Sequence, residues 1–324
     1  MMAAPALPKI ARGDMTKDLD LAPDELFALL DLAKDVKHSP QLYRSALAGK
    51  SIVLLFEKPS LRTRLTFELA IQQLGGFSLL NEGRIGEREP LKDMARNLDR
   101  WVSAIVARTF LQKTVDGLAH WSRVPVINAL SDAYHPCQAL ADMQTVREHF
   151  GSARGVKFAF VGDGNNMAHS LMLNAARLGM DFALATPERY EASAEVIAQA
   201  RDIATGTGSR ILITHDPAEA ARRSNVIYTD VWTSMGEENE AAERRTAFAD
   251  YQVDDELFSH AEPGALFMHC LPARRGEEVT GNVIESSRSV VFDQAENRLH
   301  VQKALLLMLL DERTGDSPLC AGKR

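Results

Sequence analysis

The sequence predicts an α/β protein of two domains, each a parallel sheet flanked by helices, with a C-terminal helix that returns to the first domain. Three observations predict this class. Short apolar runs such as Ser51–Phe56 (SIVLLF) alternate with amphipathic stretches along most of the chain. The runs lack polar alternation, which is typical of strands buried on both faces. The length of 324 residues is about twice a usual domain of roughly 150.

The first half is expected to contain strands at 51–56, 104–107 and 124–127. An amphipathic helix follows Pro23, and a second helix follows the first strand and is stopped by Gly75. A third helix has Pro136 in its first turn and ends at Gly151. We expect the domain boundary near 151–155, which gives domains of 1–150 and 151–324.

The second half repeats this alternation. Its expected strands are 157–161, 182–185, 210–214, 226–229, 265–270 and 289–292, and its expected helices include 167–178 and 191–204. The last helix is predicted from 297 to about 313, packed back on the first domain. Polar clusters follow several strands, at the edge where open α/β sheets bind ligands.

Composition excludes several classes of function. The formal net charge of −7 argues against a nucleic-acid partner. The apolar run Ala304–Leu310 is far shorter than the ~20 residues of a membrane span. Cys137, Cys270 and Cys320 have neither disulfide-framework nor zinc-site spacing, so we expect a cytoplasmic protein without a bound metal. The first 14 residues do not resemble a secretory signal.

The segment Ser60-Leu61-Arg62-Thr63-Arg64 leaves a predicted strand and enters a helix. Backbone N–H groups at a helix start favour a bound anion, and an arginine can bind phosphate oxygens in a fork. Ser60 could equally be an ordinary N-cap, with the arginines on an exposed face.

Two further turns carry polar side chains. Arg108 ends the third strand, and His135 and Gln138 flank the start of the helix at Pro136. Neutral donors that converge on one point suit a carbonyl oxygen that becomes an oxyanion. A structural histidine is the alternative for His135 taken alone.

These motifs resemble those of the carbamoyltransferases. Ser60–Arg64 resembles their SxRTR motif, His135–Gln138 is similar to their HPxQ motif, and the resemblance covers about 14 to 312. It implies that the first domain binds carbamoyl phosphate. The residues that the resemblance places around it are Ser60, Leu61, Arg62, Thr63, Arg108, His135, Gln138, Cys270, Leu271 and Arg298.

The second half indicates the other substrate. The GDGNN run at 162–166 is not a dinucleotide fingerprint, because Met167 stands where glycine is needed. It resembles a segment of the ornithine carbamoyltransferases, as does the run Asp230–Gly236 (DVWTSMG), a loop expected to be mobile. The resemblance implies that Asn166, Asp230, Ser234 and Met235 bind ornithine. Asp230 could instead merely cap the following turn.

His269-Cys270-Leu271-Pro272 separates this branch from the aspartate carbamoyltransferases, which carry proline in place of Cys270. A buried cysteine is otherwise usually a small apolar residue. In this family context Cys270 is expected to meet the reacting amine. One position departs from the pattern: Arg84 stands where related enzymes carry a glutamine that a neighbouring subunit lends to the active site.

The resemblance implies transfer of the carbamoyl group of carbamoyl phosphate to the side-chain amine of L-ornithine, which gives L-citrulline and phosphate, a step of the arginine-biosynthesis or urea-cycle type. The expected catalytic residues are Arg62, Arg108, His135, Gln138, Asp230 and Cys270. No cofactor is expected, and the family implies a homotrimer or a multiple of trimers. The alternatives are a sister enzyme that takes acetylornithine, succinylornithine, putrescine or lysine, a catalytically silent relative, and a nucleotide-dependent oxidoreductase.

Overall fold

The computed structural model describes residues 7–234, 236 and 238–310. By their internal contacts these residues form two compact units. Unit 1 holds 7–144 and 297–310, and unit 2 holds the described part of 145–296. The division falls within two helices, α5 (Pro136–Phe150) and α12 (Val291–Leu310).

Unit 1 contains a four-stranded parallel sheet in the order β2-β1-β3-β4. Its strands are β1 (Ser51–Phe56), β2 (Phe77–Glu82), β3 (Ala104–Arg108) and β4 (Val126–Leu130). Because all four strands run the same way, their carboxyl ends share one edge of the sheet. Glu57 follows β1 at this edge, and Arg108 is the last residue of β3.

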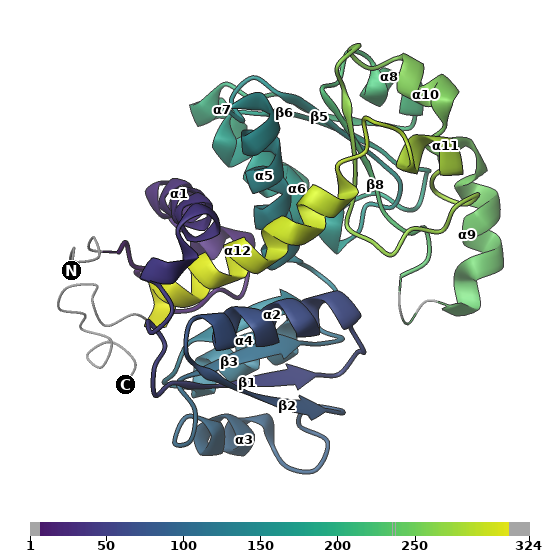
Figure 1. Ribbon diagram of the computed structural model, residues 1–324. Helices are drawn as coiled ribbons and strands as arrows, with labels where there is room; N and C mark the ends of the chain where they lie inside the picture. The colour runs from purple at the N-terminus through teal and green to yellow at the C-terminus, as the bar shows by residue number, and fades with distance from the viewer. Residues whose placement is uncertain (1–6, 235, 237, 311–324) are drawn as a thin grey trace. The chain divides into compact units, whose positions relative to one another are not determined.

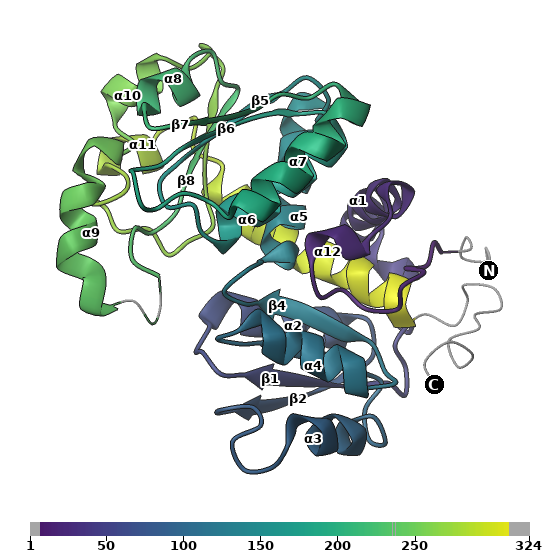
Figure 2. The same cartoon turned by 180° about the vertical axis from the view of Figure 1, so that it is seen from behind.

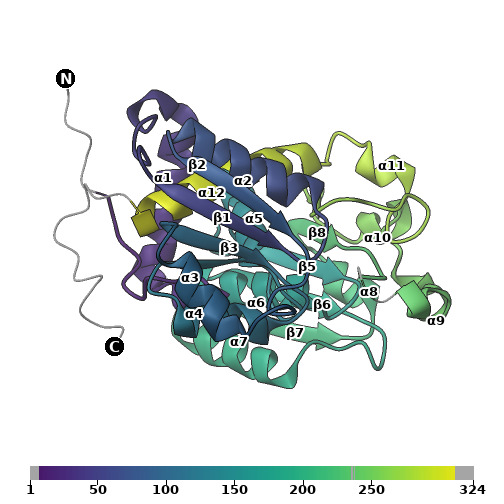
Figure 3. The ribbon, with the colours of Figure 1, turned by 90° about the horizontal axis from the view of Figure 1, so that it is seen from below.

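The helices of unit 1 cover both faces of this sheet. They are α1 (Pro23–His38), α2 (Leu61–Gln73), α3 (Leu91–Leu98) and α4 (Gln112–Trp121), together with the ends of α5 and α12 that belong to this unit. Helices α2 and α3 lie on opposite faces (Figure 1). Helices α3 and α4 pack on the face that carries Val53, Leu55 and Ile105 (Figure 3). Buried apolar residues on both faces of β1 explain its unbroken apolar sequence.

Unit 2 contains a five-stranded parallel sheet in the order β7-β6-β5-β8-β9. The strands are β5 (Lys157–Val161), β6 (Asp181–Ala185), β7 (Ile211–Thr214), β8 (Val226–Thr229) and β9 (Leu266–His269). Stacked rings of Phe158, Phe160, Phe182 and Tyr228 fill one layer of the core. The predicted α/β class with parallel sheets is confirmed.

Helices α6 (Asn166–Leu178) and α7 (Ala194–Thr207) lie side by side on the sheet of unit 2 (Figure 2). The shorter helices of this unit are α8 (Pro217–Ala221), α9 (Ala241–Ala247), α10 (Asp255–Ser259) and α11 (Gly281–Ile284). Within the described residues, no helix combines the length and apolar character that a membrane crossing requires.

Two expectations about the elements are wrong. The strand expected at 289–292 is absent, because Ser289 forms only an isolated bridge with Phe267 and α12 already begins at Val291. A short apolar run is ambiguous between strand and helix, and here the helix extends through it. The last helix therefore starts six residues before 297, and its expected end near 313 lies outside the described residues.

Candidate active site

The N-terminus of α2 supplies the first part of a site in unit 1. Ser60 is the N-cap, and its Oγ accepts a hydrogen bond from the Thr63 backbone N–H at 3.3 Å. The capping interpretation is thus correct, and it is compatible with anion binding because other N–H groups of the first turn have no partner within the helix. Arg62 is half-buried in this first turn, and Leu61 is exposed.

Arg298, which is distant in sequence, contacts the start of α2. Arg298 on α12 donates from Nη2 to the Thr63 Oγ1 at 2.6 Å, across 235 positions of sequence. Both side chains belong to residues that are at most 3% exposed. A guanidinium held this firmly is preorganised for an anion at the start of α2.

His135 is buried beside two guanidinium groups. Its pKa lies well below the usual range, chiefly because burial disfavours the charged imidazolium and also because the Arg298 and Arg108 guanidiniums repel it. The imidazole is therefore neutral near pH 7 and able to donate one hydrogen bond. The cationic charge here comes from the arginines.

Gln138 differs in one respect from the role expected of it. Its Nε2 donates to the Asp142 Oδ1 at 2.8 Å, so the amide nitrogen is engaged by the protein. Its Oε1 is buried and has no hydrogen-bond partner among the described residues. In this orientation Gln138 offers an acceptor, which suits a substrate –NH₂ group better than a carbonyl oxygen.

Cys137, between His135 and Gln138, is a core residue. It is fully buried, and its thiol lies 3.4 Å from the Asn128 carbonyl oxygen as donor. Burial raises the pKa of this thiol to about 12, so it remains protonated and unreactive.

Glu57, which sequence reasoning missed, ties two loops to the end of β1. Its Oε1 accepts from the Ile85 N–H at 3.0 Å and its Oε2 from the Phe110 N–H at 2.8 Å. The Arg84 guanidinium lies 4.0 Å from the centre of the Phe110 ring, and the Lys58 Nζ lies 4.7 Å from it. Glu57 thus positions the loop that carries Arg84 beside the turn after Arg108.

In unit 2 the GDGNN run forms the turn between β5 and α6. A Cβ on Gly164 would lie 2.2 Å from the Ala192 backbone nitrogen, so only glycine fits there. Asn165 is the N-cap of α6, and its Oδ1 accepts from the Met167 N–H at 2.9 Å. Asn166, the expected ligand, is the half-buried first residue of the helix.

The carboxylate of Asp230, just after β8, is the centre of a polar cluster in unit 2. Its Oδ1 accepts from the Cys270 Sγ at 3.0 Å and from the Val231 N–H at 2.8 Å. Its Oδ2 accepts from the Asn165 Nδ2 at 3.3 Å, a contact that sequence reasoning also missed. Asp230 is 8% exposed. The turn-capping alternative accounts only for the Val231 contact.

A buried pair supports the turn that carries Cys270. The His269 Nδ1 accepts from the Leu271 N–H at 2.8 Å, and its Nε2 lies 3.2 Å from the Glu278 Oε1. His269 and Glu278 are fully buried, and Leu271 has a positive φ of 57°. The pair therefore fixes an unusual backbone turn next to the Cys270 thiol.

Asp230, His269 and Cys270 form the one group of potential metal ligands found in the described part of the chain, with donor atoms within 4.8 Å of one another. Both ring nitrogens of His269 already have partners, and the thiol already contacts Asp230. A metal would have to displace these contacts, so the group fits a hydrogen-bonded cluster better than a cation site.

The expected ornithine loop is described only in part. Ser234 is half-buried, and Met235 lies outside the described residues. Gly236 has a positive φ of 104°. The loop is anchored at Trp232, whose carbonyl oxygen accepts from the Arg244 Nη1 at 3.1 Å. The same guanidinium nitrogen pairs with the Asp163 Oδ2 at 2.9 Å, buried inside unit 2.

The structure thus groups the expected residues into two sets. Unit 1 carries Ser60, Leu61, Arg62, Thr63, Arg108, His135, Gln138 and Arg298, and unit 2 carries Asn166, Asp230, Ser234, Cys270 and Leu271. One set is cationic with neutral hydrogen-bonding groups, and the other centres on a carboxylate. Such a division suits an anionic substrate on unit 1 and a cationic substrate on unit 2.

Comparison with known proteins identifies the class. Residues 14–148 match the model of the aspartate/ornithine carbamoyltransferase carbamoyl-P binding domain, and residues 154–309 match that of the Asp/Orn binding domain. The chain belongs to the aspartate/ornithine carbamoyltransferase family.

Several ornithine carbamoyltransferases are similar to this chain. That of Acidothermus cellulolyticus is 50% identical over 301 residues, which cover 92% of this chain and 96% of the relative. That of Pyrococcus abyssi is 50% identical over 296 residues, which cover 90% and 93%. The solved structure of the ornithine carbamoyltransferase from Pyrococcus furiosus superposes with a TM-score of 0.90 at 47% identity, covering 95% of this chain and 99% of that one.

Proposed function

We propose that this chain is an ornithine carbamoyltransferase, which transfers the carbamoyl group of carbamoyl phosphate to the side-chain amine of L-ornithine and releases L-citrulline and phosphate. The observation that carries the choice of acceptor is the buried Asp230 carboxylate with the Cys270 thiol 3.0 Å away. A buried carboxylate is a counter-charge for a cationic substrate, and a thiol beside it can hydrogen-bond a reacting amine. The relatives of about 50% identity that carry this name support the same acceptor.

Unit 1 would bind carbamoyl phosphate. The start of α2, with Arg62, Arg108 and Arg298, would hold the phosphate, since guanidinium groups bind phosphate oxygens in a fork. Neutral His135 would donate to the carbamoyl carbonyl oxygen, and the buried Oε1 of Gln138 would accept from the carbamoyl –NH₂. The hydrogen bond from His135 strengthens as negative charge develops on the carbonyl oxygen during attack.

Unit 2 would bind ornithine. Asn166, Asp230, Ser234 and Met235 would bind the amino acid, and Cys270 with Asp230 would orient the side-chain amine. The ammonium, with an ordinary pKa near ~10.4, must first lose a proton. The amine lone pair then forms the C–N bond, the bond from the carbamoyl carbon to the bridging oxygen breaks, and phosphate leaves with that electron pair. The attacking nitrogen gives up a second proton, which the leaving phosphate takes up. No cofactor enters this balance.

An acceptor panel tests the proposal. Citrulline or its analogue is measured with carbamoyl phosphate and, separately, ornithine, acetylornithine, succinylornithine, putrescine and lysine. Ornithine should give a kcat/KM at least ~100-fold above acetylornithine, succinylornithine and putrescine, each of which lacks one of its charged groups, because desolvated ion pairs discriminate by several kcal/mol. It should exceed lysine at least ~10-fold, because one extra methylene costs about 1–3 kcal/mol. A higher value with any other acceptor would assign the chain to a sister enzyme. Activity with none would leave a silent relative.

We further propose a homotrimer, supported by an apolar patch on unit 1. Leu61, Leu65 and Leu69 recur every four residues on one face of α2, and Phe77 and Leu79 lie on the edge strand β2; all five are more than 40% exposed. Monomeric proteins rarely expose apolar patches of this kind.

Light scattering on the intact protein tests the oligomeric state. The Leu65→Asp/Phe77→Asp variant should be a monomer, whereas the control Phe292→Asp, at a still more exposed apolar side chain on α12, should remain a trimer. A wild-type monomer would contradict the proposal. A reducing, cytoplasmic location is proposed as well, supported by the absence of a disulfide at Cys137 and Cys270 among the described residues.

Arg84 is proposed as an additional phosphate ligand lent by a neighbouring subunit, as its position in the family pattern implies. Mixed trimers of Arg62→Ala and Arg84→Ala subunits test this. An Arg84→Ala subunit keeps its own Arg62, and an Arg62→Ala neighbour can lend it an intact Arg84. Activity should therefore return in the mixed trimers. If Arg84, stacked on Phe110, serves only its own subunit, mixing restores nothing.

A further inference from the structure

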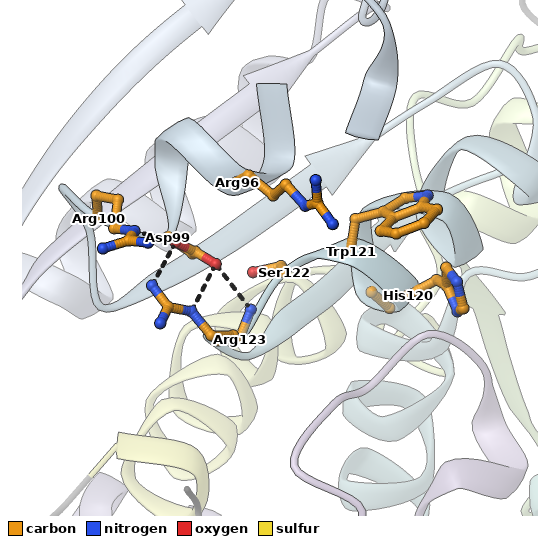
Figure 4. A pocket seen from close by; sticks show the side chains of 8 residues that line it. Arg96, Asp99, Arg100, His120, Trp121, Ser122 and Arg123 are labelled. Carbon is orange, nitrogen blue, oxygen red and sulfur yellow. Dashed lines mark hydrogen bonds and ion pairs between the residues drawn. The ribbon is translucent and has the colours of Figure 1, made fainter. Parts of the chain in front are cut away.

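A cationic hollow lies in unit 1, formed by the C-terminal ends of α3 and α4 and the residues that follow them (Figure 4). It encloses about 820 Å³, a volume typical of small-molecule sites. Its lining residues are Arg96, Asp99, Arg100, Ala119, His120, Trp121, Ser122 and Arg123. Three arginines and one aspartate line it, so the lining carries an excess of two positive charges in a chain whose formal net charge is −7.

This hollow is separate from the site at the start of α2. The residues that line it come shortly before β3 and β4 in the sequence, so it lies at the edge of the sheet where these strands begin. Arg108, by contrast, ends β3 at the opposite, carboxyl edge. The five residues of β3 span roughly 16 Å at about 3.3 Å per residue. None of the residues proposed to bind carbamoyl phosphate lines it.

Asp99 holds two of the guanidinium groups in place. Its side chain is only 3% exposed, and it accepts from the Arg123 Nε and Nη2 at 3.0 Å each and from the Arg123 backbone N–H at 3.3 Å. The Arg100 Nε lies 3.6 Å from the same carboxylate. These contacts hold the pKa of Asp99 below its usual value, chiefly through the Arg123 hydrogen bond. One buried anion thus positions two cations, which lowers the entropy lost when they bind a ligand.

The opposite wall is aromatic. The Arg96 guanidinium lies 5.0 Å from the centre of the Trp121 ring, and the Lys92 Nζ lies 5.1 Å from it. The His120 ring meets the Trp121 ring edge-on. A cation in the last turn of a helix is favoured by the helix dipole, which accounts for Arg96. It does not account for Arg100 and Arg123 converging on a single carboxylate.

We propose that this hollow binds a small molecule with a chain of two or more phosphates. Guanidinium forks match phosphate oxygens, and a chain of phosphates supplies the several negative charges that three arginines leave unbalanced. Such a chain occurs in inorganic polyphosphates and in nucleoside polyphosphates. In the second case the exposed Trp121–Arg96 wall would contact the base.

Calorimetric titration of the full chain with inorganic tripolyphosphate and, separately, with ATP at low ionic strength tests the proposal. Binding should persist in Arg62→Ala, which damages the other phosphate pocket, and weaken at least tenfold in Arg96→Ala/Arg100→Ala. Lys113→Ala, which removes an exposed cation of α4 outside the lining, is the matched control and should bind like wild type. Arg96→Gln alone replaces the double variant if circular dichroism shows that the latter is unfolded.

Tighter binding of ATP than of tripolyphosphate would identify a nucleoside polyphosphate, and equal binding an inorganic one. The proposal is overturned if wild type binds neither probe at millimolar concentration. It is also overturned if the arginine variants bind like wild type, or if binding disappears in Arg62→Ala. Because binding is measured without substrates, these outcomes do not depend on which amine the enzyme carbamoylates.

Discussion

Replacing Asp230 by asparagine removes the buried charge at the centre of the unit 2 cluster while keeping the side chain's shape. The carboxylate accepts from the Cys270 thiol, the Val231 N–H and the Asn165 amide. Asparagine has one acceptor oxygen in place of two, so its –NH₂ must face at least one of these donors. A buried donor without an acceptor costs about 1–3 kcal/mol, and loss of a hydrogen bond to a charged group costs about 1.5–3 kcal/mol.

The second of these costs falls on ornithine, whose ammonium loses its counter-charge. We therefore expect kcat/KM for ornithine to fall by a factor of ~10 to ~150, at about 1.4 kcal/mol per tenfold, while the KM for carbamoyl phosphate stays within about twofold. Citrulline formation is measured against each substrate in turn. Asp181→Asn is the matched control, since this aspartate begins β6 and pairs with the exposed Arg210. The reasoning is refuted if Asp230→Asn uses ornithine within threefold of wild type.

Three further predictions concern individual side chains. Arg62→Ala should lower kcat/KM for carbamoyl phosphate at least ~100-fold with an unchanged circular dichroism spectrum, because a phosphate fork is lost; near-normal turnover would contradict the phosphate assignment. Cys270→Ala should raise the KM for ornithine more than that for carbamoyl phosphate, and equal kinetics for both would make Cys270 a packing residue. The pKa of His135 is lower in the folded protein than in the unfolded chain. As the pH falls below about 6.5, the unfolded chain therefore binds a proton at this histidine before the folded protein does. The folded protein loses stability in this range, until the pH reaches the lower pKa of the folded state. His135→Asn should therefore lose less stability than wild type in urea unfolding between pH 7 and pH 5, and an identical loss would exclude this linkage.

The sequence predicted the central strands well because their residues are buried on both faces. The run Ser51–Phe56 became β1 with the expected bounds, and 157–161 and 226–229 became β5 and β8. Strand β2 was not predicted, because it is an edge strand in which Phe77 and Leu79 are exposed and Ser78 and Asn81 interrupt the apolar pattern. An apolar pattern in the sequence arises where side chains are buried, and an edge strand buries few of its side chains.

For the candidate site, motifs in the sequence indicated which residues to expect, whereas long-range contacts between distant residues left no pattern that could be read. Arg298 was assigned to the phosphate site from family resemblance, but its hydrogen bond to Thr63 depends on the packing of α12. Glu57 was missed because both its partners are backbone N–H groups. Asn165 was missed because its partners are a backbone N–H group and the carboxylate of the distant Asp230. Such contacts leave no spacing pattern in the sequence. A carboxylate just after a buried strand, as at Glu57, is the signal that could have found the first of them.

The hydrogen bond from Arg298 to Thr63 also has a consequence for biosynthesis. A ribosome makes Thr63 235 positions before Arg298, so a growing chain lacks this guanidinium until α12 has been made. With the phosphate role proposed for Arg298, capture of carbamoyl phosphate has to wait until α12 has been translated, and fragments truncated ahead of α12 should not retain the ligand.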